Sequence, residues 1–150
     1  MSTTGFLEHF KGHHIFVAMP EFNGAPWHMH KPYEECKNGL LEKNKEGWGI
    51  FFTVNLLDES LDQGRHRTKK MVKRCRAVFM DDDIPRDEAR TDFPIVPSIT
   101  VNSSPGKYHY YWLTDTDELD EWSKVQNGII AKYDGDNNAK DLTRYLRLPG

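Results

Sequence analysis

The chain has 150 residues and a net charge of -3, and 37% of its residues are hydrophobic, 12% aromatic and 29% charged. This balance is typical of one folded domain with a real core, and it excludes a disordered chain. No apolar run approaches the ~20 residues of a membrane span and the N-terminus lacks the plan of a signal peptide, so we expect a cytoplasmic protein with no membrane partner, in which Cys36 and Cys75 are free thiols.

The hydrophobic pattern predicts strands and helices in alternation. Strands are expected at 14–19, 47–57, 77–83, 95–102 and 108–113, helices at 32–44 and 117–133, and a last extended segment at 144–150. In the second helix an apolar stripe is expected, formed by Leu119, Trp122, Val125 and Ile129. Short hairpin strands mixed with helices favour an α+β fold, a sheet covered by helices on one face.

A strongly basic segment, "RHRTKKMVKRCR" at 65–76, carries seven Lys and Arg residues and no acid. Taken alone, this pattern is typical of a solvated helix face. Its position directly before an acidic cluster favours a second interpretation, because phosphate ligands need both a cation-rich surface and a metal-type acidic site.

The acidic cluster is "AVFMDDDIPRD", an apolar run that ends in Asp81, Asp82 and Asp83. Residues two apart share a face of a strand, so Asp81 and Asp83 are expected to project together, ~7 Å apart, with Asp82 turned away. Two carboxylates on one face can ligate a divalent cation such as Mg²⁺, which converts their repulsion into shared coordination.

The hairpin "SSPGKYHYYWL" supplies candidate phosphate ligands. His109, Tyr111 and Leu113 fall on one face of the second strand, so we expect one face to join the core and the other to line a site. Backbone N–H groups of the turn and Lys107 suit phosphate oxygens. The segment is not a Walker A loop, because Tyr108 occupies the position of the required Ser or Thr.

The C-terminal stretch "YDGDNNAKDLTRYLRLPG" adds acids and arginines. Asp134, Asp136 or Asp141 could complete a metal site begun at 81–83. Arg144 and Arg147, three residues apart, could bind a triphosphate bidentately. The alternative is a helix start with capping aspartates and surface arginines.

In this order, the three motifs resemble those of the archaeo-eukaryotic primase superfamily, and within it the primase-polymerase domain of plasmid and phage replication proteins. The resemblance spans residues 48–150. Asp81 and Asp83 match the first motif, with Asp82 as an alternate; Ser104 to His109 match the second; Asp136, or alternatively Asp141, matches the third.

The resemblance implies an RNA-recognition-motif-like palm and template-directed primer synthesis from nucleoside triphosphates on single-stranded DNA, with Mg²⁺ or Mn²⁺. It implies that residues 1–150 are one catalytic domain of a longer replication protein that works with a replicative helicase. The implied catalytic residues are Asp81, Asp83, His109 and Asp136; the nucleotide ligands are Ser104, Lys107, His109, Arg144 and Arg147; the template contacts are Arg65, Arg67, Lys69, Lys70 and Lys73.

Two other classes of function remain open. His28-x-His30 is similar to the metal-binding pair of rolling-circle endonucleases, which use a tyrosine nucleophile. Because Pro26 and Pro32 flank the two histidines, we interpret the pair as a loop feature. A zinc site of His28, His30 and Cys36 has no recognised spacing. A non-enzymatic single-stranded-DNA-binding module would use the basic segment and aromatic residues, but it would not need converging acids.

Overall fold

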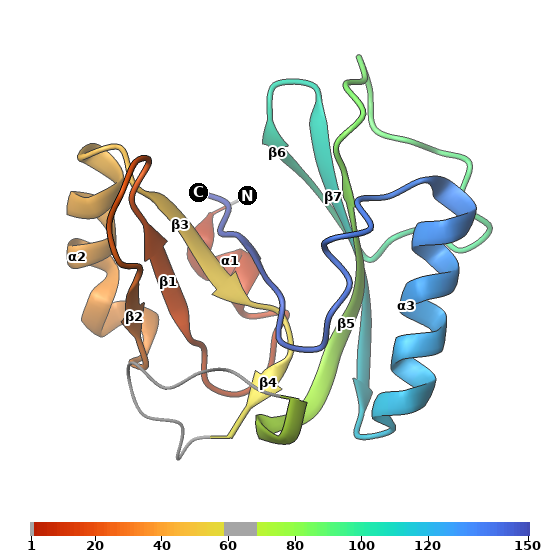
Figure 1. The fold of residues 1–150 in the computed structure, drawn as a ribbon, viewed down its shortest axis with the longest axis horizontal. Coiled ribbons are helices and arrows are strands. Elements are labelled where there is room, and N and C mark those ends of the chain that lie inside the picture. Colours follow the sequence, from red (N-terminus) through yellow and green to blue (C-terminus); the bar gives the residue numbers. More distant parts are fainter. Residues whose placement is uncertain (1, 59–68) are drawn as a thin grey trace.

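A computed structural model describes residues 2–58 and 69–150, and its strands form two four-stranded sheets that lie side by side (Figure 1). The first sheet has the order β2-β1-β3-β8, with β1 (Phe16–Met19), β2 (Trp27–Met29), β3 (Gly49–Thr53) and β8 (Tyr145–Arg147). The second has the order β4-β5-β7-β6, with β4 (Leu56–Leu57), β5 (Val72–Asp82), β6 (Ile99–Ser104) and β7 (Lys107–Thr116). Every neighbouring pair in both sheets is antiparallel.

In the described ranges, three α-helices accompany the sheets: α1 (Thr3–Leu7), α2 (Tyr33–Lys45) and α3 (Leu119–Tyr133), together with the short 3-10 helix η1 (Lys69–Met71). Helix α2 lies beside the first sheet and α3 beside the second (Figure 1). None of the helices in the described part of the chain has the length and apolar character needed to cross a membrane. The predicted α+β class is confirmed, with the strands divided between two sheets rather than gathered in one.

The basic segment differs most from its predicted structure. Taken alone, its pattern is typical of a solvated helix face, but residues 72–76 form the first half of β5, where Cys75 and Arg76 are buried. The segment 47–57 is likewise two strands, β3 and β4, and the strand predicted at 95–102 begins only at Ile99.

The buried stripe of α3 also differs from the apolar spacing. Val125 is 49% exposed, whereas Gln126 is fully buried between Trp122 and Ile130 on the inward face. The Gln126 amide accepts a hydrogen bond from the Phe79 backbone N–H at 2.9 Å and donates one to the Phe79 carbonyl at 2.5 Å. This edge of β5 therefore pairs with a side-chain amide, which satisfies backbone groups that burial would otherwise leave unpaired.

Arg76 connects the two sheets. Its side chain is 5% exposed and donates to five backbone carbonyls from two other segments, those of Thr53, Val54, Asn55, Lys11 and His13. Asn55 completes the junction, since its amide oxygen accepts from the Arg76 N–H and its amide nitrogen donates to Leu142 O. Burial lowers the pKa of Arg76 to about 9, which leaves the guanidinium charged at neutral pH.

We predict that Arg76→Met destabilises the protein by about 3 kcal/mol or more, because it leaves several buried carbonyls without donors. Urea denaturation of the two proteins measures the difference. Arg74→Met is the matched control, since Arg74 pairs with Asp115 at the surface and its loss should leave the midpoint near that of wild type. Equal midpoints for all three proteins would contradict the role given to Arg76.

Candidate active site

The pairing of β5 with β7 places an acid beside a histidine. Asp81 and His109 are direct partners in the antiparallel register, so their side chains share one face of the sheet. His109 Nε2 lies 3.2 Å from Asp81 Oδ1, and the His109 side chain is 7% exposed. Tyr111, on the same face, lies in the core with no exposure, so the face that carries the site residue His109 also joins the core, and Leu113 beyond it is 37% exposed away from the cleft.

Asp136 reaches this face through a tight turn after α3. Asp134 ends the helix in the left-handed conformation, with φ of 57°. The next residue must be a glycine, because a Cβ at position 135 would lie 2.5 Å from Met80 Cγ. The Asp136 N–H then donates to Asp81 O at 2.8 Å, which ties the turn to the end of β5.

Three carboxylates converge as a result. Asp81, Asp83 and Asp136 can each offer one oxygen so that the three atoms lie within 4.8 Å of one another, and they form the one such group of three found among the described residues. An all-oxygen, all-anionic set suits a hard divalent cation such as Mg²⁺ or Mn²⁺. Partial burial raises the pKa of Asp83, the charges of Asp81 and Asp136 raise it further, and Lys107 acts in the opposite direction.

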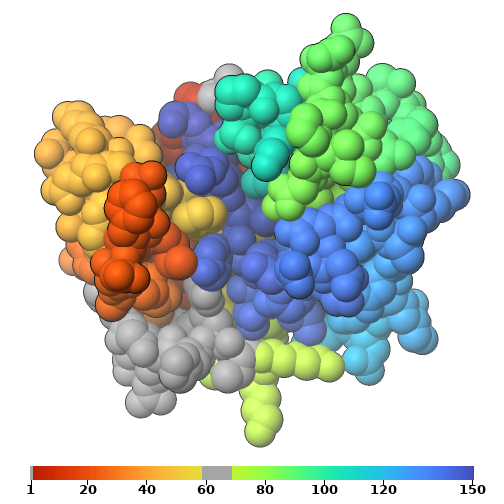
Figure 2. Space-filling model, turned by 45° about the horizontal axis from the view of Figure 1, so that its top comes forward, coloured from red at the N-terminus to blue at the C-terminus, as the bar shows by residue number. Residues whose placement is uncertain are grey.

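The acid group lines a cleft of about 310 Å³. Its other lining residues include Phe51, Ser103, Ser104, Lys107, His109, Arg144, Tyr145 and Arg147. In Figure 2 the dark blue C-terminal residues lie between the orange and yellow residues, which include α2 and part of the first sheet, and the green and teal residues that follow β5 and form the β6–β7 hairpin. The cleft thus receives side chains from both sheets.

The turn between β6 and β7, which precedes Lys107, is held by contacts on both sides. Ser104 pairs with Lys107 across Pro105 and Gly106, and Gly106 has a φ of 77°, as the third position of a type II turn requires. The Arg86 N–H donates to Gly106 O at 2.8 Å and anchors the turn from outside. Lys107 therefore faces the acids from a rigid support.

The arginines of the C-terminal motif have different surroundings. Arg144 Nε donates to Asp141 Oδ1 at 2.9 Å, and its Nη2 donates to Asn138 O. Arg147 is exposed, and its guanidinium carbon lies 5.4 Å from the centroid of the Phe51 ring. Of the two, Arg147 has the side chain that can turn toward a ligand phosphate.

The two alternate metal ligands lie outside the acid group. Asp82 is fully buried on the other face of β5, where its carboxylate accepts from Arg86 Nε at 2.5 Å. Asp141 pairs with Arg144 and lines a separate depression beside Lys69 and Lys140.

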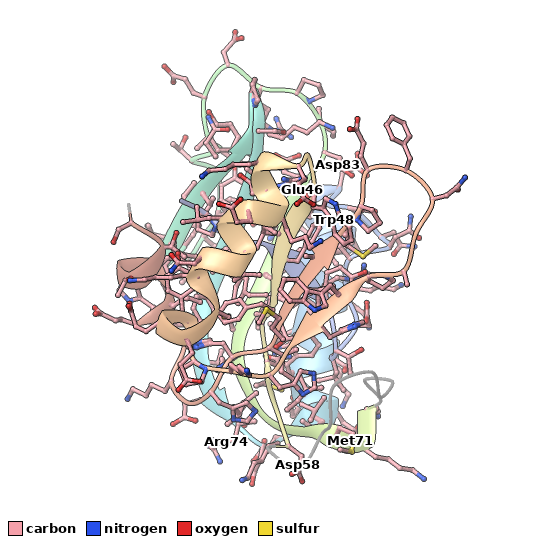
Figure 3. All side chains as sticks on the ribbon, turned by 90° about the vertical axis from the view of Figure 1, so that its left-hand side faces the viewer. Glu46, Trp48, Asp58, Met71, Arg74 and Asp83 are labelled. Carbon is pink, nitrogen blue, oxygen red and sulfur yellow. The ribbon has the colours of Figure 1, made fainter. Side chains whose placement is uncertain are left out.

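The three predicted template contacts that the structure describes are distant from the acids. Lys69, Lys70 and Lys73 are exposed, but they lie near the start of β5, whereas the aspartates lie at its end, roughly 25 Å away at ~3.3 Å per residue. Figure 3 shows Met71 and Arg74 at the opposite end of the molecule from Asp83. Arg65 and Arg67 lie outside the described residues.

The endonuclease motif does not join the cleft. His28 lies in β2, so its interpretation as a loop feature is wrong, and it pairs there with Val17. His30 lines another depression, with His13 and His14, and Cys36 is buried in α2. Within the described ranges, these residues form no group of three ligands.

Sequence reasoning missed Phe51 and Tyr145 as cleft residues. Both lie on the face of the first sheet opposite the buried Phe52 and Leu146. Period-two alternation in "GIFFT" and "RYLR" contains this signal, but only the pairing of β3 with β8 brings the two rings together.

The described chain thus combines two antiparallel sheets with a group of three acids that shares its cleft with Lys107 of the β6–β7 hairpin. Residues 38–150 match the RepB DNA-primase N-terminal domain, and the chain belongs to this family. The resemblance to primase-polymerases is thereby confirmed, with the match beginning at residue 38 rather than 48. No curated protein sequence matches the chain.

Solved structures agree in fold. The primase-polymerase domain of cyanophage S-2L has a TM-score of 0.72 at 14% identity, covering 99% of this chain and 80% of that one. Primase RepB′ has a TM-score of 0.70 at 16% identity, and the alignment covers 97% of this chain and 48% of RepB′. Its catalytic domain in complex with initiator DNA has a TM-score of 0.69 at 17% identity, with coverages of 97% and 73%.

The partial burial of Asp83 and the repulsion from Asp81 and Asp136 predict a pH effect on stability. Because the pKa of Asp83 is raised in the folded state, the folded protein binds this proton more tightly than the unfolded chain does, so ionised Asp83 lowers stability above the folded-state pKa. Asp83→Asn should therefore melt at a higher temperature than wild type at neutral pH in EDTA.

The advantage should shrink as the pH falls through the folded-state pKa of Asp83, where the wild-type carboxyl becomes neutral. Differential scanning fluorimetry across this range measures it, with the exposed Asp117→Asn as control. A lower melting temperature for Asp83→Asn at every pH would contradict the repulsion.

Proposed function

We propose that the chain is a metal-dependent, template-directed primase-polymerase domain that joins nucleoside triphosphates on single-stranded DNA to prime replication. One observation carries the proposal. The residues of three motifs, far apart in the sequence, line a single cleft, with Asp81, Asp83 and Asp136 on one side of the Lys107 and His109 side chains. A single-stranded-DNA-binding module has no use for three converging acids, which repel the nucleic acid backbone.

In this proposal Asp81, Asp83 and Asp136 hold Mg²⁺ or Mn²⁺. Divalent metal in such a site stabilises the attacking and leaving oxygens of an in-line displacement at phosphorus. A primer 3′-hydroxyl attacks the α-phosphate of the bound nucleotide, the new P–O bond forms, and the bond to pyrophosphate breaks. Ser104, Lys107 and His109 orient and neutralise the triphosphate, so positioning and electrostatics account for most of the rate.

The Asp81–His109 contact gives His109 a defined orientation. Nε2 faces the Asp81 carboxylate, which favours a proton on that nitrogen, while Nδ1 is buried without a hydrogen-bond partner among the described residues. We infer that Asp81 both holds metal and positions the imidazole at the cleft that receives the triphosphate. His109→Ala should then raise the Michaelis constant for nucleotide as well as lower turnover.

The partners follow from the same proposal. The RepB′ catalytic domain has been solved with initiator DNA, which supports DNA as a ligand of this chain, and the proposal takes its template to be single-stranded. We further propose that residues 1–150 act as one catalytic domain of a replication protein and cooperate with a replicative helicase.

The decisive test is template-dependent incorporation of labelled nucleotides with Mg²⁺ or Mn²⁺. We expect Asp81→Asn and Asp136→Asn each to lower incorporation by about 10³-fold or more, on the order of the loss of a transition-state electrostatic group, without loss of folding. Asp141→Asn is the matched control and should stay close to wild type, because Asp141 lies outside the acid group.

The same assay separates the rival functions. His28→Ala combined with His30→Ala should leave incorporation nearly unchanged. A nucleotide-independent covalent protein–DNA adduct, lost in that double variant, would instead establish the endonuclease. Strand binding without any incorporation by the wild-type protein would establish the binding module.

The exposed lysines at the start of β5 generate a separate prediction. Changing Lys69, Lys70 and Lys73 to Ala should weaken single-strand binding and flatten its salt dependence by about 0.7 slope unit for each phosphate that is no longer neutralised. Because these lysines lie far from the acids, the effect should appear with a 16-nucleotide strand and be absent with a tetranucleotide, which are about the limits of common single-strand sites.

Fluorescence anisotropy at several salt concentrations measures both effects. The control removes an equal charge elsewhere, at the exposed Lys45, Lys124 and Lys132. If the two triple variants show the same salt dependence of binding, the basic segment is a solvated surface and does not contact the template.

A further inference from the structure

One wall of the cleft has no part in the chemistry described so far. Phe51 and Tyr145 line it from the first sheet, opposite the acids of β5. Their rings meet edge to face with centroids 5.3 Å apart. The proposed function gives neither ring a role, although both side chains line the cleft and are only partly buried.

The Phe51 ring has a fixed orientation because Gly49 precedes it by two residues on the same face of β3. A Cβ at position 49 would come within 2.9 Å of Phe51 Cε2 and 3.2 Å of its Cζ. The ring therefore leans over the backbone of Gly49, into space that any side chain would fill. The φ of this glycine is not in the left-handed region, so the space, rather than the backbone conformation, explains the residue.

Further contacts hold the ring from other sides. Tyr145 packs against it, and the Tyr145 hydroxyl lies 3.8 Å from Met19 Sδ. The guanidinium of Arg147, the residue paired with Phe51 across the strands, lies 5.4 Å from its centroid. A preoriented ring that remains partly open beside a cation matches the surface on which nucleobases stack.

We propose that Phe51 is the stacking platform for the base of the incoming nucleotide, and that Gly49 leaves the space in which the Phe51 ring lies over the strand. This inference rests on the proposed function and adds the base-binding residue to it. The cleft measures about 310 Å³, which suits one small ligand rather than a length of strand. With the triphosphate held by Lys107 and His109 on one wall, the base can reach the opposite wall, and Arg147 borders both.

The test compares two ligands that differ by the nucleoside. A nucleoside triphosphate and inorganic tripolyphosphate are each titrated with Mg²⁺ into the protein by calorimetry, without template. Phe51→Leu should weaken nucleotide binding about tenfold, the effect of losing one base–aromatic stack, and leave tripolyphosphate binding unchanged. Phe51→Trp should restore nucleotide binding.

Gly49→Ala provides an independent variant, because it moves the ring without removing it. Gly49→Ala should also weaken binding of the nucleoside triphosphate and leave binding of tripolyphosphate unchanged. Phe22→Leu is the control, since Phe22 is 80% exposed and does not line the cleft. Circular dichroism verifies folding, and Phe51→Trp shows whether the position tolerates a changed side chain.

The outcomes are distinct. If Phe51→Leu weakens the binding of both ligands equally, or of neither ligand, Phe51 is not the stacking platform, while the proposed polymerase function stands. A loss of single-strand affinity with unchanged nucleotide affinity overturns the stacking platform as well, since the ring would then contact template. If the wild-type protein binds neither the nucleotide nor tripolyphosphate, the proposed function itself fails.

Discussion

The close approach of three carboxylates is the constraint around which the rest of the structure is organised. Like charges with oxygens within 4.8 Å of one another oppose folding unless a cation lies between them. The pKa of Asp83 is raised first by partial burial and then by the charges of Asp81 and Asp136, so part of its shift reflects that opposition. Two local features enforce the approach: the register of β5 with β7, and the turn at Gly135, which has no Cβ to strike Met80. A fold that holds acids together at such a cost is suited to binding divalent metal.

The cleft also depends on the junction between the two sheets, because neither sheet carries the whole set of lining residues. Asp81 and the β6–β7 hairpin come from the second sheet, Asp136 comes from the turn after α3, and Phe51 comes from the first sheet. Arg76 holds the sheets together because its guanidinium N–H groups donate hydrogen bonds to backbone carbonyls rather than to a carboxylate. Buried charge is normally expensive, and the number of acceptors around this guanidinium offsets the loss of water.

Local patterns predicted what depends on neighbouring residues alone. Strand alternation placed Asp81 and Asp83 together and turned Asp82 away, and the order of the motifs indicated the primase family. The burial of Gln126 and Arg76 escaped prediction, because each is set by unpaired backbone groups of a distant segment. Phe51 escaped for the same reason, since it joins the cleft only when β8 pairs with β3. The catalytic and ligand-binding roles of the individual residues remain predictions.

The central claim, that this cleft holds metal and a triphosphate together, is tested most directly by crystals grown with Mn²⁺ and a non-hydrolysable nucleoside triphosphate. Anomalous scattering locates the metal without reference to the protein side chains. We expect Mn²⁺ among Asp81, Asp83 and Asp136, with the triphosphate extending toward Lys107 and His109. Mn²⁺ bound at His28 and His30, with the cleft empty of both ligands, would contradict the claim.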